Sequence, residues 1–345
     1  MKSFKLALVG ATGVVGRAAQ KVLEEKNLPI SEYAFFASKK SAGSKINFLG
    51  KEYIVRELDE HSFDEGFDFA IFSAGAGTAK KYAPIAAEHG CIVVDNSSAF
   101  RMDKDIPLVV PEVNPEEIKN NHGIIANPNC STIQAVVALK PLDDKYTIKR
   151  IVYSTYQAVS GAGRDGIDDL ENGIKNFKEG QDINVAESNK YDLKKFPYPI
   201  FNNCLPHIDV FLDNGYTKEE MKMINETRKI LGKPDLAITA TTVRVPVLNS
   251  HSESINVEFE NEFDINELKD LLSKSQDIVL VDDINEEKYP LATSATGQDN
   301  VLVGRVRRDY SIKNGLNFWC VADNIRKGAA SNAVQIVEKL IEMKS

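Results

Sequence analysis

The feature that most limits how this 345-residue chain can fold is a glycine pattern near its start. The apolar run Phe4–Val9 predicts a strand, Gly10-Ala-Thr-Gly13-Val-Val-Gly16 follows, and a helical pattern covers about Val14 to Glu25. Small residues between a strand and a helix let the backbone approach a pyrophosphate, which the helix N-terminus stabilises. The pattern predicts a dinucleotide site, although a tight turn that binds nothing is the alternative. The expected cofactor contacts are Gly10, Thr12, Gly13, Val14, Val15 and Gly16.

The loop after the second predicted strand bears on the choice of cofactor. Tyr33–Ala37 predicts that strand, and Ser38-Lys39-Lys40-Ser41-Ala42-Gly43 follows it. NAD enzymes usually place an Asp or Glu here to hold the ribose 2′-hydroxyl, whereas hydroxyls and lysines suit a 2′-phosphate. The sequence therefore favours NADP over NAD, and a basic surface loop is the alternative. The expected contacts in this loop are Ser38, Lys39, Lys40 and Ser41.

A third loop belongs to the same expected site. It lies between the strand patterns Asp68–Ser73 and Cys91–Val94 and begins Ala74-Gly75-Ala76-Gly77-Thr78. Small residues of this kind allow the backbone to come close to a bound cofactor. We expect contacts from Ser73, Ala74 and Gly75.

Length and composition limit the class of protein. A chain of this length favours two domains. The net charge of −8 and the pI of about 5.4 argue against a nucleic-acid or membrane-surface partner, so an anionic ligand needs a local cluster of cations. We find neither a signal-peptide pattern nor an apolar run near the roughly 20 residues of a membrane span, and we expect a cytoplasmic protein. The four cysteines have no metal-binding spacing, so no metal site is expected.

A candidate nucleophile stands in Asn127-Pro-Asn-Cys130-Ser-Thr132. The apolar, helix-forming run Ile133–Leu139 follows at once, which places the sulfur at a helix N-terminus. Free N–H groups and the positive end of the helix dipole favour the thiolate there, and the same helix end can hold the oxyanion of a carbonyl under attack. The alternative is a buried cysteine that packs as a small hydrophobic residue.

The sequence pattern changes near residue 150. Strand patterns become longer, with mixed faces that suggest antiparallel pairing, and polar helical segments lie between them. We assign no function to the polar segment Glu179–Phe201. The predicted strands are Lys149–Val159, Leu236–Leu248, Ser254–Glu260, Asn300–Arg308 and Leu316–Ala322, and the predicted helices are Arg164–Lys178, Lys218–Leu231 and Ala329–Met343.

Seven segments, in order, carry a family resemblance. They are Gly10–Gly16, Asp95-Asn-Ser-Ser-Ala-Phe-Arg101, Asn127–Thr132, Tyr156-Gln-Ala-Val-Ser-Gly161, Glu219-Glu-Met-Lys222 with Glu226-Thr-Arg-Lys229, Val243-Arg-Val-Pro246 with His251, and Ala322-Asp-Asn-Ile-Arg-Lys-Gly328. Together they resemble aspartate-β-semialdehyde dehydrogenase of the bacterial type. The resemblance implies NADPH-dependent reduction of L-aspartyl-4-phosphate to L-aspartate-4-semialdehyde and phosphate, in lysine, threonine, methionine and isoleucine biosynthesis, by a homodimer.

The resemblance also implies residue roles. Cys130 is the nucleophile that forms a thioester, His251 is the acid/base residue, and Gln157 orients the intermediate. For the substrate, Arg244 binds the carboxylate, Glu219 the ammonium, and Lys222 and Arg101 the phosphate, with Asn96 nearby. The cofactor contacts expected near the nicotinamide are Ser160, Gly161 and Asn324.

The residue patterns agree with these roles without requiring them. Arg244 points to the strand face opposite Val243 and Val245, so it can turn its planar fork toward a carboxylate or merely lie on a half-exposed sheet. Glu219 and Lys222 share a helix face, which also suits a solvated ion pair. His251 is expected in a loop.

The expected fold is α/β: a Rossmann-like doubly wound cofactor domain plus an α+β catalytic and dimerisation domain with a mixed sheet. We assign residues 1–131 and 323–345 to the first domain and 132–322 to the second. Three alternatives remain. N-acetyl-γ-glutamyl-phosphate reductase shares the chemistry, but its substrate has no free ammonium for Glu219. The motif around Cys130 does not resemble glyceraldehyde-phosphate dehydrogenase. A non-catalytic nucleotide-binding sensor or scaffold is the third.

Overall fold

The computed structural model describes residues 3–181 and 193–344. They form two compact units: unit 1, from the described residues of Met1–Asn129, Lys229–Leu231 and Gly328–Ser345, and unit 2, from those of Cys130–Arg228 and Gly232–Lys327. Residues 182–192 of the segment Glu179–Phe201, to which the sequence assigned no function, lie outside the described residues. No helix in the described ranges is long and apolar enough to cross a membrane.

Unit 1 is built on a parallel sheet in the order β5-β2-β1-β6-β7-β8. The order runs outward from β1 in both directions, so the sheet is doubly wound, as predicted. A separate hairpin joins β3 and β4. The strands are β1 (Phe4–Val9), β2 (Ile30–Ala37), β3 (Lys45–Phe48), β4 (Lys51–Ile54), β5 (Arg56–Glu57), β6 (Phe69–Phe72), β7 (Ile92–Asp95) and β8 (Ile124–Ala126), and the helices are α1 (Val14–Lys26), α2 (Ala76–Glu88), α8 (Asn332–Lys344) and a 3₁₀ helix at Pro115–Asn120.

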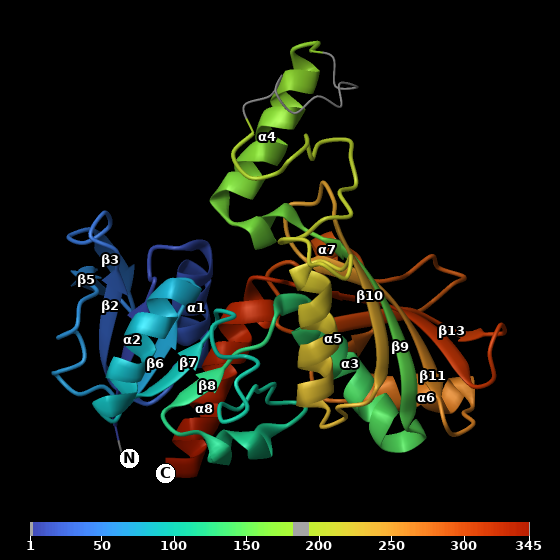
Figure 1. The fold of residues 1–345 in the computed structure, drawn as a ribbon, viewed down its shortest axis with the longest axis horizontal. Coiled ribbons are helices and arrows are strands. Elements are labelled where there is room, and N and C mark those ends of the chain that lie inside the picture. The colour runs from blue at the N-terminus through green and yellow to red at the C-terminus, as the bar shows by residue number, and fades with distance from the viewer. Residues whose placement is uncertain (1–2, 182–192, 345) are drawn as a thin grey trace. The chain divides into compact units, whose positions relative to one another are not determined.

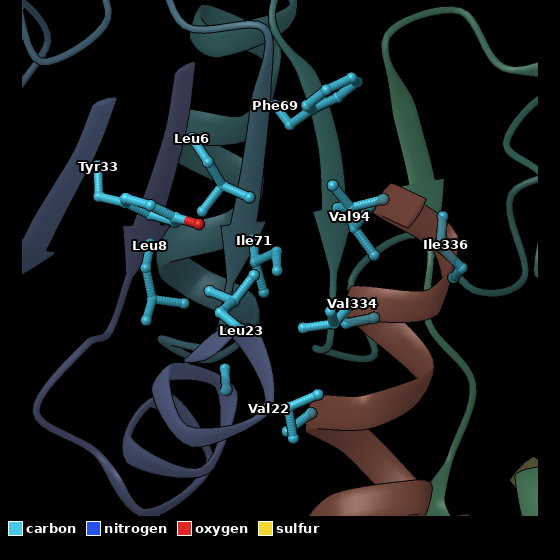
Figure 2. Close-up of a cluster of buried hydrophobic side chains, with 14 of the residues drawn as sticks. Leu6, Leu8, Val22, Leu23, Tyr33, Phe69, Ile71, Val94, Val334 and Ile336 are labelled. Atoms are coloured by element: carbon cyan, nitrogen blue, oxygen red, sulfur yellow. The ribbon is translucent and has the colours of Figure 1, made fainter. Parts of the chain in front are cut away.

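Both faces of this sheet are buried, which explains why its strands are continuous apolar runs in the sequence. Leu6 and Leu8 of β1 belong to one cluster, which also holds Leu23 of α1 and Val334 of α8 (Figure 2). Ala7, the intervening residue, belongs to a second cluster on the opposite face. Full burial of one large apolar side chain contributes about 1.5–3 kcal/mol. Residues near the end of the chain thus complete the core that its first strand begins.

Unit 2 is built on a mixed sheet in the order β10-β9-β11-β14-β13-β12 (Figure 1). Helix α3 packs against β9, β11, β13 and β14, and most of its side chains are buried. The strands are β9 (Ile148–Gln157), β10 (Ala237–Arg244), β11 (His251–Phe259), β12 (Ile278–Leu280), β13 (Val301–Asp309) and β14 (Gly315–Ala322). The helices are α3 (Cys130–Tyr146), α4 (Arg164–Lys178), α5 (Lys218–Ile230), α6 (Ile265–Lys274), α7 (Ala292–Ala295) and the 3₁₀ helix η2 (Val159–Ala162).

Two details differ from the sequence-based expectation. Strand β10 pairs parallel with β9 rather than antiparallel, because the connection between the two strands carries α4 and α5 and returns the chain in the same direction. The last helix was expected from Ala329, but a π-helical turn covers Arg326–Ser331 and the α-helix begins at Asn332. The mixed α/β architecture itself is confirmed.

We predict opposite effects for two glycine-to-alanine substitutions in unit 1. A Cβ on Gly16 would lie 2.2 Å from the carbonyl oxygen of Gly10, so Gly16→Ala must displace the backbone of the glycine loop. A Cβ on Gly77, in α2, meets nothing within 4 Å, and Gly77→Ala should stabilise the helix by up to about 1 kcal/mol. Thermal unfolding should show a lower Tm for the first variant and an unchanged or higher Tm for the second. Equal Tm values would contradict the close packing described for Gly16.

Candidate active site

Three strand ends bring the central residues of the candidate site together. Gln157 and Arg244 are the last residues of β9 and β10, and they are register partners in that parallel pair. His251 is the first residue of β11, which runs antiparallel to β9. The carboxyl ends of two parallel strands and the amino end of an antiparallel neighbour meet at one sheet edge. This edge collects an amide, a guanidinium and an imidazole.

The sequence suggested that His251 lies in a loop, and this prediction was wrong. His251 is the first residue of β11 and is fully buried. The turn ends at Ser250, which has a positive φ of 71° and donates its N–H to Asn324 Oδ1 at 2.8 Å. His251 then pairs with Ala322 of β14, so the strand begins directly after the turn. Burial, followed by the positive charge of Arg244, lowers the pKa of His251 to about 3, although Glu219 acts in the opposite direction.

Cys130 is the first residue of α3 and is partly exposed. Its position matches the helix N-terminus predicted from the sequence, and no acidic residue lies in the first turn to oppose the thiolate. Burial lowers the pKa of Arg244, whereas Glu219 and Cys130 raise it, so these groups interact electrostatically. Cys91 and Cys320 are buried, and burial raises the pKa of both thiols. Cys130 thus has a setting that neither of these two shares.

A chain of hydrogen bonds links the sheet edge to α5. Gln157 Oε1 accepts from Thr155 Oγ1 at 3.0 Å, and Gln157 Nε2 donates to Glu219 Oε1 at 3.2 Å. Lys222 Nζ donates to Glu219 Oε2 at 3.0 Å and to Asp209 Oδ2 at 2.7 Å. Although burial opposes it, the pKa of Lys222 is raised by Glu219 and Asp209. Asp209 was not predicted, because an aspartate in an irregular loop has no periodicity to mark it.

The structure distinguishes the two adjacent glutamates of α5. Thr217 lies just before the helix. The N–H of Glu220 donates to Thr217 Oγ1 at 3.2 Å, and the N–H of Thr217 donates to Glu220 Oε2 at 2.7 Å. This reciprocal pair is a capping box, and Glu220 Oε1 also accepts Thr242 N–H at 3.1 Å. Glu220 therefore stabilises the helix start and its attachment to β10. Glu219 is left to face Gln157 and Lys222, as the spacing predicted.

Arg244 is a buried cation that suits an anionic ligand. It is 5% exposed, and its Nη1 donates to the carbonyl oxygen of Ala158 at 2.6 Å. Its Nε has no hydrogen-bond partner among the described residues. A Cβ on Gly161 would lie 3.0 Å from Arg244 Nη1 and 3.2 Å from His251 Nε2, so only glycine fits there without displacing these groups. A planar guanidinium with an unused edge can bind a carboxylate through two hydrogen bonds.

Ser160 and Asn324, predicted as cofactor contacts, lie together in unit 2. Asn324 Nδ2 is 3.1 Å from Ser160 Oγ, and both side chains are buried. Asn324 Oδ1 also accepts the N–H of Ser250. The pair therefore ties the start of η2 to the turn before His251.

The predicted cofactor loops of unit 1 meet at the carboxyl ends of β1 and β6. A Cβ on Gly10 would lie 2.4 Å from the carbonyl oxygen of Ser73, so the two loops touch through backbone atoms. Helix α1 begins after Gly13 without a side-chain cap and without an acidic residue in its first turn. Uncapped N–H groups at this switch of strand order fit a pyrophosphate. Lys39 and Lys40 are exposed, and within the described ranges neither forms an ion pair.

Asn96 and Arg101, the other predicted substrate contacts, lie together in unit 1. Arg101 Nη2 donates to the carbonyl oxygen of Asn96 at 2.8 Å, and its Nε donates to that of Asn127 at 2.9 Å. The side-chain amide of Asn96 is buried and has no hydrogen-bond partner in the described part of the chain. A buried amide of this kind is costly unless a ligand or water satisfies it, which fits a polar ligand.

Glu253 is a second residue that sequence reasoning missed. It is fully buried two residues beyond His251 on β11, opposite Thr155 of β9 and Cys320 of β14. Its carboxyl oxygens have no hydrogen-bond partner among the described residues. Burial, followed by Glu219, raises the pKa of Glu253 well above its ordinary value, so it is a neutral acid in the fold. The available signal was an acidic residue just before the predicted strand Ser254–Glu260, at a position that continues the alternating apolar face of Ile255 and Val257.

In the described ranges, no group of three His, Cys, Asp or Glu side chains is placed to hold a metal ion.

Comparison with known proteins shows the class of protein to which this chain belongs. The family model described as "Semialdehyde dehydrogenase, NAD binding domain" matches residues 5–121, and "Semialdehyde dehydrogenase, dimerisation domain" matches residues 139–327. The chain is 52% identical to an aspartate-semialdehyde dehydrogenase of Aquifex aeolicus, covering 98% of both chains. It is 49% identical to that of Campylobacter jejuni, covering 100% of this chain and 99% of the relative. The chain belongs to the aspartate-semialdehyde dehydrogenase family, as its motifs predicted.

Solved structures agree. A Vibrio cholerae aspartate semialdehyde dehydrogenase II complexed with ASA has a TM-score of 0.93 at 46% identity and covers 99% of both chains. The Candida albicans enzyme, solved with NADP, has a TM-score of 0.74 at 25% identity and covers 98% of both chains.

We predict that Glu253→Gln becomes more stable relative to the unaltered protein as pH rises. Above pH of about 4.5 the unfolded chain releases the Glu253 proton while the folded chain keeps it, so stability falls by about 1.4 kcal/mol per pH unit up to the raised folded pKa. The neutral amide lacks this loss. The Tm difference between variant and unaltered protein should therefore widen by roughly 2 °C per pH unit between pH 5.5 and 7.5.

Glu258→Gln, on the partly exposed face of the same strand, is the matched reference for changing a glutamate to its amide. A Tm difference for Glu253→Gln that stays constant over this pH range would show that Glu253 is ionised in the fold.

Proposed function

We propose that this protein reduces L-aspartyl-4-phosphate with NADPH to L-aspartate-4-semialdehyde and phosphate, with Cys130 as the nucleophile. The observation that carries the proposal is the combination of a cysteine at the start of α3 with Arg244, Glu219, Gln157 and a buried His251 in the same unit. An acyl phosphate needs a soft nucleophile, and its amino-acid part needs one cation and one anion. This site offers each of these groups.

The substrate's charged groups suit three side chains. Arg244, a buried cation with an unused Nε, binds the α-carboxylate through its planar fork. Glu219 receives the α-ammonium, which an N-acetylated substrate lacks. Lys222 binds the phosphate by exchanging at least one of its two carboxylate partners.

The chemistry of the residues follows from these contacts. The Cys130 thiolate attacks the acyl carbon, a C–S bond forms, and the C–O bond to phosphate breaks with its electron pair on the leaving group. Gln157, fixed by Thr155 and Glu219, orients the thioester, and His251 contacts the reacting carbonyl. NADPH, when bound, supplies the hydride. The C–S bond then breaks and returns Cys130 to the thiolate.

We also propose which parts of the chain bind the cofactor and which carry the substrate site. Residues 1–131 and 323–345 hold the cofactor, with the pyrophosphate at the start of α1 and the 2′-phosphate at Lys39 and Lys40. Residues 132–322, together with Cys130, carry the substrate site, and residues 132–322 make the contact with a second copy in a homodimer. An apolar hollow lined by Tyr289, Pro290, Leu291 and Trp319 supports an interface on unit 2.

The first test is phosphate-dependent reduction of NADP by the purified protein, followed by NADPH absorbance. L-aspartate-4-semialdehyde should react, and N-acetyl-glutamate-5-semialdehyde should react at least about a hundredfold more slowly, because Glu219 then faces no ammonium. Cys130→Ser should bind NADPH but lack turnover.

Activity only with the acetylated aldehyde would favour the N-acetyl-γ-glutamyl-phosphate reductase alternative. Turnover in Cys130→Ser would contradict the nucleophile. If the protein binds NADPH but shows no activity with either aldehyde, a sensor or scaffold would be favoured.

The second test concerns the cofactor. Replacing both Lys39 and Lys40 by alanine should raise the KM for NADP about tenfold, because a charge-assisted contact to the 2′-phosphate is worth about 1.4 kcal/mol or more. The KM for NAD should stay within about twofold. Lys45→Ala, at an exposed lysine of the β3–β4 hairpin paired with Glu52, is the matched control. Equal changes in both KM values would remove these lysines from the 2′-phosphate site.

A further inference from the structure

A buried carboxylate of α4 fixes a short piece of chain that leads to the candidate site. Asp169 is 3% exposed, and its two oxygens accept three consecutive backbone N–H groups. The N–H of Lys194 donates to Oδ1 at 2.8 Å, and those of Lys195 and Phe196 donate to Oδ2 at 2.9 and 3.0 Å. Hydrogen bonds to a charged acceptor are roughly twice as strong as those between neutral groups. This one carboxylate therefore holds the backbone of residues 194–196.

The ring of Phe196 faces both α4 and Arg244. A Cβ on Gly166 of α4 would lie 3.2 Å from Phe196 Cζ, so the glycine gives the ring room against the helix. Arg244 Cζ lies over the ring, 6.0 Å from its centroid. The ring also packs against an apolar cluster, which consists of Val159, Leu170, Ile200 and Leu205. Phe196 is thus an ordered aromatic neighbour of the cation that suits the substrate carboxylate.

Arg244 is fixed at its backbone and at one nitrogen of its side chain. Its N–H donates to the carbonyl oxygen of Leu205 at 2.8 Å, and its own carbonyl oxygen accepts from Leu205 at 2.9 Å. Its Nη1 donates to Ala158, and its Nε has no hydrogen-bond partner among the described residues. One side-chain hydrogen bond does not fix the plane of a guanidinium. An aromatic face can do so, because it is electron-rich and attracts a cation most strongly where water is excluded.

Resting on the proposed function, we propose that the aromatic face of Phe196 holds the Arg244 guanidinium in the orientation that binds the substrate carboxylate, and that Asp169 holds Phe196 in place. Both are positioning residues, since Phe196 acts through the guanidinium and Asp169 through the backbone of residues 194–196. A bidentate contact requires the guanidinium and the carboxylate to share a plane. Loss of the aromatic face weakens this contact equally in the ground state and the transition state, which raises KM and leaves kcat unchanged.

The first experiment separates the charge of the ring face from its bulk. Phe196→Leu keeps an apolar side chain without an aromatic face, whereas 3,5-difluorophenylalanine in place of Phe196 keeps the ring but makes its face less negative. We expect the KM for L-aspartate-4-semialdehyde to rise about tenfold in the first protein and about threefold in the second, with kcat within about twofold. The KM values for phosphate and NADP should stay within about twofold.

Phe201→Leu is the matched control. Phe201 packs against the same apolar cluster, but its ring contacts Phe177, with 5.5 Å between the centroids. Its KM for the aldehyde should therefore stay within about twofold of the unaltered value. An unchanged KM in Phe196→Leu, or a rise there without any rise in the fluorinated protein, would overturn the role of the aromatic face. If Phe196→Leu does not fold, the fluorinated protein decides, because its ring has nearly the shape of phenylalanine.

The second experiment tests Asp169 and needs no turnover. Asp169→Asn replaces one acceptor oxygen by an NH₂ group, which cannot accept a backbone N–H. Asp168→Asn is the control, since Asp168 contacts the same segment through Lys194 Nζ, at 2.7 Å, and not through its backbone. We expect amide hydrogen exchange of residues 194–196 to become about tenfold faster in Asp169→Asn and to stay within about twofold in Asp168→Asn.

Asp169→Asn should also raise the KM for the aldehyde, as Phe196→Leu does. Unchanged exchange, or faster exchange without a change in KM, would overturn the link from Asp169 to Arg244. These outcomes are distinct from a failure of the proposed function, because that failure would appear as a lack of turnover in the unaltered protein, whereas the exchange rates would still decide whether Asp169 holds residues 194–196.

Discussion

The candidate site depends on the parallel pairing of β9 with β10 beside an antiparallel β11. This pairing puts the last residues of two strands and the first residue of a third at one sheet edge, where Gln157, Arg244 and His251 lie. The same edge supplies the backbone atoms of Ala158, whose N–H faces His251 and whose carbonyl oxygen accepts from Arg244. A single residue after β9 therefore orients both a neutral ring and a buried cation.

Burial gives these groups their chemical character. His251 and Glu253 are fully enclosed on the same face of β11, and the cost of charging a group away from water keeps both neutral. Charge is confined to groups that have partners or suit a ligand: Lys222 with Glu219 and Asp209, and Arg244 with an unused Nε. A charged amino-acid substrate would thus meet complementary charges in a site whose other polar groups are uncharged.

Much of the fold could be predicted from local pattern. The helix Arg164–Lys178 and the strand Phe4–Val9 have the predicted bounds, because hydrophobic period and turn residues mark their ends. Cys130 was predicted at a helix start from a proline turn followed by an apolar run. Two predictions were wrong, and both depend on contacts between distant parts of the chain: β10 was expected to pair antiparallel, and His251 was expected in a loop. Strand partners come from distant parts of the chain, so no short window of sequence contains them.

The sequence by itself determined the family, the doubly wound cofactor domain, the mixed sheet and the residue types available for chemistry. These depend on glycine spacing, apolar period and motif order, all of which are local. Only the tertiary structure decided that Glu220 caps α5 while Glu219 faces Gln157, that Asp209 pairs with Lys222, and that Ala158 holds His251. Hydrogen-bond partners and burial depend on contacts between segments far apart in the chain, and folding alone creates those contacts.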